Sequence, residues 1–293
     1  MQLNTNTITI SALFPLISTV FVLCLGIFVF SKNRKLKVNQ IFFLFTICLT
    51  IWLFATFVMF TSEEDALIIF WDRIVYIGVI FIPITIYHFS LEFAKIEAQR
   101  KLLYLGYFLS IIFLILSRTN YFVEDLYKYS WGSHTQARFF HHVFLVFFTF
   151  YILLFLLNIW RYHQRVKGVE RAQAKYVLLL TPAFIFGSPA FLPAYGISVY
   201  PVPYLSVIFG SVCLAYAITK HYLFEIKVIL TELLVGAMGV ILLILPLLVE
   251  TLQLRILTTG ILLLFCIFGY FLVRYTHEEI AYKEKLHKKE EGL

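Results

Sequence analysis

The chain has 293 residues, of which 61% are hydrophobic and only 14% are charged. A soluble domain of average composition carries about 25% charged residues, so this chain lacks the polar surface that water requires and its solvent is a lipid bilayer. The net charge of +7 does not indicate nucleic-acid binding, because the basic residues lie in short clusters between apolar segments, as they do in membrane proteins of defined orientation.

Nine apolar segments approach or exceed the roughly 20 residues that a helix needs to cross a bilayer. The sequence therefore predicts an all-α, polytopic integral membrane bundle of about nine transmembrane helices. The predicted spans are 8–30, 40–60, 70–94, 102–117, 140–160, 176–196, 203–219, 228–250 and 255–273. The expected parts are a seven-helix domain over 1–226, two additional membrane helices over 227–273 and a charged, helical cytoplasmic tail over 274–293.

Positive charge predicts the orientation of these spans, since Lys and Arg gather in the cytoplasmic loops of membrane proteins. With the N-terminus outside, nineteen of the 24 basic residues fall on the cytoplasmic side. The sequence therefore predicts an outside N-terminus and a cytoplasmic C-terminus.

The third predicted span, 70–94, contains the candidates for ligand binding or signal coupling. These are Arg73, Tyr76, Pro83, Tyr87, His88 and Glu92. At 100° per residue the first four share one stripe, and a stripe with a cation and two phenols faces the protein interior or a wet cavity rather than lipid. His88 and Glu92 lie one turn apart, where they can form a hydrogen bond. The alternative is that Arg73 and Glu92 anchor the helix at opposite membrane surfaces.

The outer segment 118–142 holds further candidates for an outward-facing ligand pocket, namely Trp131, His134 and Arg138. Three histidines and two acidic residues in this segment raise the alternative of a metal site, but their spacing fits no known ligand pattern. We therefore expect an amphipathic loop on the membrane surface, and the sequence predicts no metal and no cofactor.

The sixth predicted span is interrupted by residues that break helices. The hinge candidates are Pro182, Gly187, Pro189 and Pro193. Proline removes a helical hydrogen bond, and the freed carbonyl groups must face protein or water because lipid cannot satisfy them. The sequence therefore predicts a kinked or locally broken helix, which serves either as a signalling hinge or as a static packing element.

Four hydrophobic stretches occur in a recognisable order and spacing. They are NQIFFLFTICLTIWLF (39–54), WDRIVYIGVIFIPITIYHFSLEF (71–93), ERAQAKYVLLLTPAFIFGSPAFLPAYGISVYP (170–201) and GSVCLAYAITKHYLFEI (210–226). Together they resemble the seven-helix membrane region at the N-terminus of certain bacterial sensor histidine kinases, over about residues 10–226. The resemblance implies an input module of the bacterial plasma membrane that passes signals inward. It carries over no binding residue, because the ligands of this family are mostly undefined.

The tail contains the pair His277-Glu278, which raises the question of a phosphate-accepting histidine. In the kinases that the chain resembles, this histidine is followed by Glu and then by Arg-x-Pro, and here no Arg or Pro follows. We therefore expect His277 to be an ordinary exposed or interfacial side chain. The tail is either the start of a signalling helix or a solvated end.

Two classes of function remain open. The first is a signal-input module without a catalytic domain, because HExxH, GxSxG, P-loop and GxGxxG motifs are all absent from the sequence. Its expected partners are the bilayer, a cytoplasmic histidine kinase or other signalling protein, and a second copy in a homodimer. The alternative is a small-solute transporter or channel, which the prolines of the third and sixth spans favour.

Overall fold

The apolar segments fold into long α-helices, because a helix satisfies its own backbone hydrogen bonds in lipid. The computed structural model describes residues 10–199, 203–219 and 252–290, with the short helical pieces 235–236, 238–239 and 242–243. The chain divides into two units, Met1–Ile218 and Thr219–Leu293, and each is described by itself.

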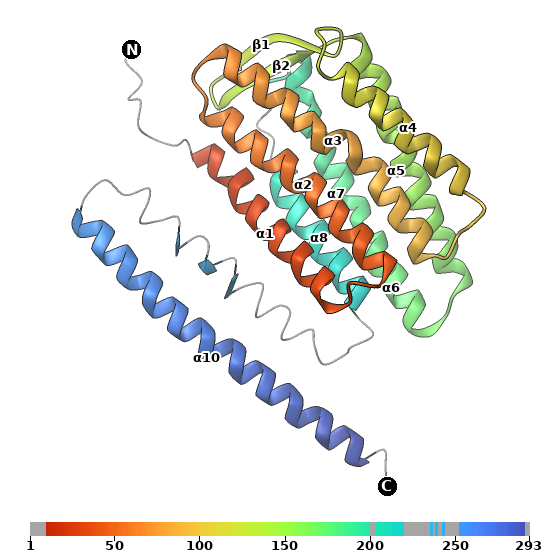
Figure 1. The fold of residues 1–293 in the computed structure, drawn as a ribbon, viewed down its shortest axis with the longest axis vertical. Coiled ribbons are helices and arrows are strands. Elements are labelled where there is room, and N and C mark those ends of the chain that lie inside the picture. The colour runs from red at the N-terminus through yellow and green to blue at the C-terminus, as the bar shows by residue number, and fades with distance from the viewer. Residues whose placement is uncertain are drawn as a thin grey trace. The chain divides into compact units, whose positions relative to one another are not determined.

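The first unit is a bundle of helices with one small hairpin at its end (Figure 1). Helices that follow one another in the chain from α1 to α6 run in opposite directions, so their connections alternate between the two ends of the bundle, and α7 and η1 continue in the direction of α6. The elements are α1 (Ile10–Lys32), α2 (Lys37–Thr61), α3 (Asp65–Phe93), α4 (Arg100–Leu116), β1 (Val123–Tyr129), β2 (Gly132–Ala137), α5 (Phe139–Arg165), α6 (Gly168–Leu178), α7 (Leu180–Gly187), the 3-10 helix η1 (Ser188–Tyr195) and α8 (Pro203–Thr219).

Helix α3 forms the centre of this bundle and contacts α2, α4, α5 and both strands. Ile80, Ile84 and Tyr87 on α3 have no exposed surface. Gly78 allows α2 to approach closely, because a Cβ atom at this position would collide with the backbone of Cys48. The predicted stripe of the third span does therefore face the protein interior.

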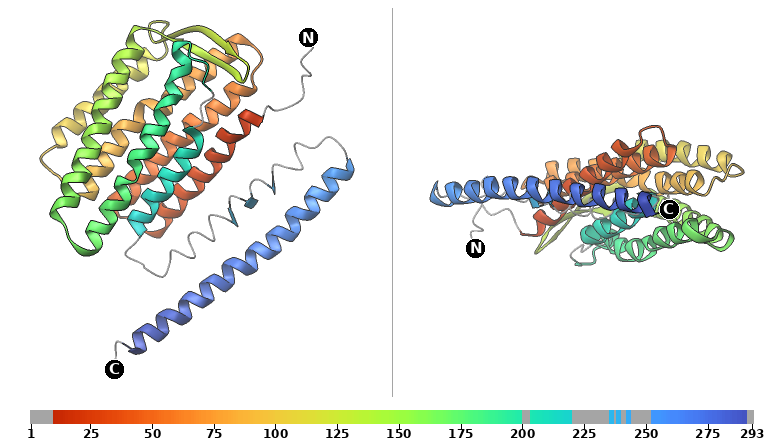
Figure 2. Two further views of the ribbon diagram at one scale, coloured as in Figure 1. Left: turned by 180° about the vertical axis from the view of Figure 1, so that it is seen from behind. Right: turned by 90° about the horizontal axis from the view of Figure 1, so that it is seen from below.

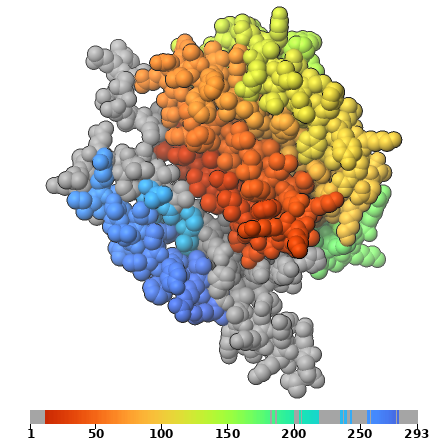
Figure 3. Space-filling view, in the orientation of Figure 1, coloured from red at the N-terminus to blue at the C-terminus, as the bar shows by residue number. Residues whose placement is uncertain are grey.

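The outer faces of several helices carry large apolar side chains. On α4, Tyr104, Phe108 and Ile115 are each at least 60% exposed. Side chains of α1 to α4 cover one face of the unit (Figure 3). An apolar surface of this extent indicates contact with lipid rather than water.

Six described helical segments are long and apolar enough to cross a membrane. They are Ala12–Lys32, Lys37–Thr61, Asp65–Phe93, Phe139–Arg165, Gly168–Tyr195 and Thr258–Thr276. Helix α4, with 17 residues, and Ser206–Ile218 of α8 are shorter apolar helices. The all-helical membrane architecture is confirmed, whereas a count of nine spans is not, and most of the predicted span 228–250 lies outside the described residues.

The sixth span is broken, as predicted, but its helix begins earlier than predicted. Helix α5 continues to Arg165 and α6 starts at Gly168, so most of residues 161–175 are helical. Hydropathy misses α6 because its charged residues keep the average low. Pro189 lies in the first turn of η1, where its missing N–H removes no helical bond. Gly196, with a φ angle of 80°, ends η1 in the left-handed conformation.

The expected amphipathic loop over 118–142 is also wrong, because this segment forms an antiparallel hairpin. Strands β1 and β2 pair from Val123 with Ala137 to Tyr129 with Gly132, with an irregularity near Asp125. The hairpin packs against α3, α2 and η1. The end of the bundle that it covers is called the hairpin end below, and the other is called the opposite end.

The described part of the second unit includes the long helix α10 (Leu252–Glu290), visible in Figures 1 and 2. It contains the predicted ninth span, and its last part, residues 274–290, covers most of the predicted tail. Arg274 and Glu278 pair across one turn at 2.9 Å. The side chain of His277 lies outside the described residues.

Candidate functional site

Polar side chains occupy the hairpin end of α3. Asp72 is fully buried and accepts a hydrogen bond from the Thr135 hydroxyl of β2. Its other carboxylate oxygen, Oδ1, has no partner in the described structure. Arg73 Nη2 donates to Asn120 Oδ1 at 2.6 Å, and the carbonyl oxygen of Arg73 accepts from Arg118 at 2.7 Å. These bonds fix the hairpin and the segment before it to α3.

Tyr76, one turn further along α3, lies where three elements meet. It is 2% exposed, and its ring meets the ring of His141 on α5 edge-on, with 5.5 Å between centroids. His141 Nδ1 lies 2.7 Å from the Tyr195 hydroxyl at the end of η1. His141 therefore links the end of η1 to α3.

The hairpin also contacts η1 directly. The hydroxyl of Tyr129 donates to the carbonyl oxygen of Pro193 at 2.6 Å. Burial, together with the neighbouring Tyr127, raises the pKa of Tyr129, so its hydroxyl keeps the proton that this bond needs. Pro193, a predicted hinge residue, is buried and its carbonyl group is satisfied by the hairpin.

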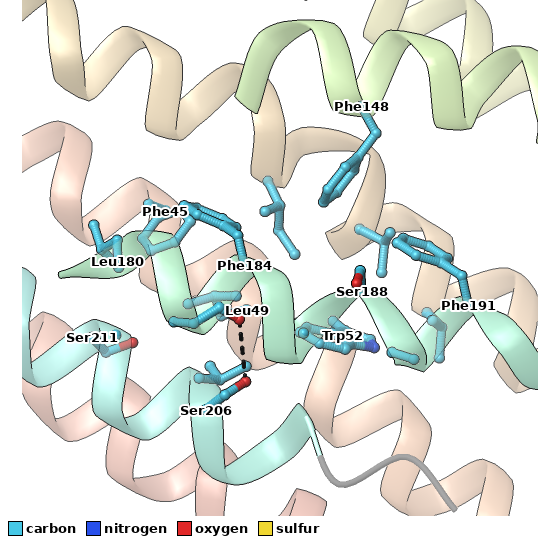
Figure 4. A pocket seen from close by; sticks show the side chains of 18 of the residues that line it. Phe45, Leu49, Trp52, Phe148, Leu180, Phe184, Ser188, Phe191, Ser206 and Ser211 are labelled. Atoms are coloured by element: carbon cyan, nitrogen blue, oxygen red, sulfur yellow. Dashed lines mark hydrogen bonds between the residues drawn. The ribbon is translucent and has the colours of Figure 1, made fainter. Parts of the chain in front are cut away.

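A cavity of about 100 Å³ lies between α2, α3, α5, α7 with η1, and α8 (Figure 4). Most of its walls are aromatic or aliphatic, and no Lys, Arg, Asp or Glu side chain from the described residues lines it. The polar or partly polar side chains in its walls are Trp52, Tyr76, His134, Ser188, Ser206 and Ser211. The chemistry of the cavity is therefore that of an uncharged, apolar site with a few hydroxyl groups.

The three serine hydroxyls of the cavity differ in their partners. Ser188 Oγ donates to the Ile185 carbonyl at 2.8 Å, and Ser206 Oγ donates to the Ala183 carbonyl at 3.4 Å (dashed in Figure 4). Ser211 is 1% exposed, and its hydroxyl has no partner in the part of the chain that the structure describes. Leaving a buried hydroxyl without a hydrogen-bond partner costs free energy. Of the three serines, Ser211 is therefore the one whose hydroxyl a ligand could satisfy.

A second polar network lies at the opposite end of α3. The Tyr87 hydroxyl donates to Gln99 Oε1 at 2.7 Å, and Gln99 Nε2 donates to Asn158 Oδ1 at 3.0 Å. Asn158 Nδ2 donates to Ser90 Oγ at 3.2 Å and to Gln99 Oε1 at 3.0 Å. Four side chains thus join α3, the start of α4 and α5 in one network.

The predicted contact between His88 and Glu92 is confirmed, with 3.5 Å between Nε2 and Oε1. Glu92 also pairs with Arg100 Nη1 at 2.5 Å, and His88 Nδ1 lies 2.9 Å from the Tyr107 hydroxyl of α4. Arg100 pairs with Glu97 as well, and this guanidinium lowers the pKa of the exposed Glu97 carboxyl. The contacts of Glu92 join α3 to α4, and its role in signalling stays a prediction.

The outer-segment candidates are not brought together in one pocket. Trp131 stacks on Tyr129, with 4.9 Å between ring centroids. Arg138 pairs with Glu124 and Asp125 at 3.2 and 3.0 Å, which holds the base of the hairpin. His134 alone of the three predicted residues lines the cavity. Within the described residues, no group of three His, Cys, Asp or Glu side chains is placed to hold a metal.

The cavity does unite residues from three separate predicted groups. Tyr76 comes from the third span, His134 from the outer segment and Gly187 from the sixth span. Asp72 and Ser211, as well as Gln99 and Asn158 of the network at the opposite end, are not among the residues predicted from the sequence. An acid inside an apolar run is a usable signal for Asp72, whereas a serine in an apolar run gives no signal for Ser211.

The helical bundle of the first unit corresponds to a known family of membrane regions. Residues 14–227 match the family model described as the N-terminal 7TM region of histidine kinase, which covers more than two thirds of the chain. The chain belongs to this family. Its members are membrane sensor regions of histidine kinase signalling rather than catalytic domains, and the resemblance predicted for residues 10–226 is confirmed. A search of curated proteins found no match.

Proposed function

We propose that this sensor region detects an extracellular or membrane-borne cue at its hairpin end and transmits it to a cytoplasmic kinase or other effector. One observation carries the proposal. Helix α3 has buried residues from Ile68 to Leu91 and holds a polar site near each end, with Asp72 and Tyr76 at one and Tyr87 at the other.

The path along α3 passes Pro83, which lies between the two polar sites. Proline has no N–H group, so the backbone carbonyl one turn earlier loses its helical hydrogen bond. A helix bends most readily at such a point. Because packed interiors switch between discrete arrangements, a displacement at Tyr76 is expected to alter the network around Tyr87.

Charge supports the orientation that this proposal requires. The basic clusters of 31–37, 95–101 and 161–175 belong to the connections and helix ends at the opposite end of the bundle (Figure 1). Under the positive-inside rule this end is cytoplasmic. The hairpin end is then outside, in a bacterial plasma membrane, with the N-terminus on the same side.

The test uses isolated membranes of the cell that produces this protein. The readout is transfer of labelled phosphate from ATP into acid-labile, alkali-stable protein phosphate, the chemistry of phosphohistidine. We expect Tyr87→Phe, which removes one bond of the network, to change this output. The control is Tyr104→Phe on α4, whose side chain is 68% exposed.

Equal output from the wild type and Tyr87→Phe, at equal abundance in the membrane, would contradict the proposal. Solute uptake into proteoliposomes by the purified chain, without any phosphate output in membranes, would favour the transporter alternative instead.

A further inference from the structure

We propose that the cavity binds a small, uncharged, mainly apolar molecule that carries one hydrogen-bonding group, such as a phenol or a short alcohol. This inference rests on the proposed function, because it names the chemical class of cue that the input module takes. The observations behind it are the size of the cavity, the chemistry of its walls and the Ser211 hydroxyl, which has no hydrogen-bond partner in the described structure.

Size limits the ligand to a single ring or a short chain. The cavity measures about 100 Å³, and an apolar cavity of about 150 Å³ in another protein accepts benzene. Charge limits the ligand further, since no Lys, Arg, Asp or Glu side chain from the described residues lines the walls, and an unpaired ion would lose its hydration on entry.

Ser211 supplies the hydrogen-bonding partner. Its side chain lies on α8 among the residues that surround the cavity (Figure 4). Its hydroxyl is buried without a partner in the described structure, whereas Ser188 and Ser206 already donate to carbonyl groups. A ligand with one hydroxyl group satisfies Ser211, and its apolar body contacts the aromatic walls.

The cavity lies between α3 and the broken sixth span, so a bound ligand contacts both. Tyr76 of α3 lies in one wall, and Phe184 and Phe191 of α7 and η1 lie in another. Gly210 brings α8 close to α7, since a Cβ there would lie 2.9 Å from Leu180 Cδ2. A molecule in this space therefore bears on both α3 and the broken sixth span.

The binding experiment uses the full chain in lipid nanodiscs and two probes, para-bromophenol and bromobenzene. The probes differ only by the hydroxyl group, and bromine quenches tryptophan fluorescence at close range. Trp52 lines the cavity, so we expect saturable quenching by both probes that Trp52→Phe removes. Empty nanodiscs and the Trp52→Phe protein give the background from probe dissolved in the lipid.

Two variants test the site itself. Ser211→Ala should weaken para-bromophenol about three- to tenfold, the factor expected from one neutral hydrogen bond, and leave bromobenzene unchanged. Gly187→Leu should abolish saturable quenching by both probes, because a Cβ at Gly187 meets nothing nearer than Ser206 Oγ at 3.9 Å and a longer side chain fills the cavity. The matched control is Gly260→Leu in α10, which does not line the cavity and has open space around its Cβ.

Three results would overturn the inference. They are quenching no stronger than the lipid background, an equal effect of Ser211→Ala on both probes, and quenching by brominated lipid chains that para-bromophenol does not displace. The last result would assign the cavity to a lipid chain. If no probe binds but Tyr87→Phe still changes phosphate output, the cavity inference fails while the proposed function stands. If the probes bind specifically but Tyr87→Phe leaves phosphate output unchanged, the cavity binds its ligand while the proposed function fails.

Discussion

The hydrogen-bond network at the opposite end of α3 allows the loss of unfolding free energy caused by Asn158→Ala to be predicted. This change removes three hydrogen bonds, two that Asn158 shares with Gln99 and one that it donates to Ser90. Side-chain hydrogen bonds between membrane helices average about 0.6 kcal/mol each, so the free energy of unfolding should fall by about 2 kcal/mol. The small size of alanine adds to this loss, because Asn158 is 2% exposed.

The assay is reversible unfolding of the full chain in mixed micelles with increasing fractions of denaturing detergent. The control is Leu153→Ala on the same helix, whose side chain is 59% exposed, and we expect it to change the unfolding free energy by no more than about 0.5 kcal/mol. A double-mutant cycle with Tyr87→Phe should show coupling, because both residues bond Gln99. A loss below about 0.5 kcal/mol for Asn158→Ala, or strict additivity in the cycle, would refute the reasoning.

Three further predictions concern separate sites and use thermal or detergent unfolding of the full chain. Thr135→Val removes the hydroxyl that donates to the buried Asp72, and should cost about 1–3 kcal/mol, whereas unchanged stability would show that this bond is unimportant. Gly187→Ala should stabilise by about 0.5–1 kcal/mol, because its Cβ meets only Ser206 Oγ, at an ordinary contact distance of 3.9 Å. Gly78→Ala should impair folding through collision with α2, and the opposite order would contradict the packing described. Because the folded-state pKa of Glu97 is lowered, its contribution to stability is present above the unfolded pKa of about 4.3 and is lost as pH falls through the lower folded value. Glu97→Gln should therefore make stability less dependent on pH in this acidic range. An unchanged pH dependence would count against the ion pair of Glu97 with Arg100 at the start of α4.

Helical periodicity and charge were sufficient to predict α3. Residues at helical spacing lie on one face of this helix, so Tyr76 and Tyr87 could be assigned to the same buried stripe. The contact between His88 and Glu92 was predictable for the same reason, since both lie on one helix a turn apart. The broken sixth span followed from its prolines, whose effect on a helix is local.

Features that depend on packing between distant segments were not predictable from the sequence. The hairpin has no Asn-Gly or Asp-Gly turn, and its strand residues do not alternate clearly between polar and apolar types. The network of Gln99 and Asn158 joins positions 59 residues apart, and no local pattern connects them. The cavity is lined by residues of α2, α3, β2, α5, α7, η1 and α8, so the position of Ser211 in its wall is defined only when the bundle is assembled.

We propose that helix α3 couples the hairpin end of the bundle to the opposite end. The most direct test is amide hydrogen exchange of the full chain in nanodiscs, comparing the wild type with Thr135→Val. The residues to follow are 94–99, which connect α3 to α4 and contain protected amides such as Ile96, bonded to the Leu91 carbonyl at 2.8 Å. We expect Thr135→Val at the hairpin end to change amide exchange at residues 94–99, and Thr61→Val to leave it unchanged. A change confined to the hairpin and the adjoining turn of α3 would contradict it.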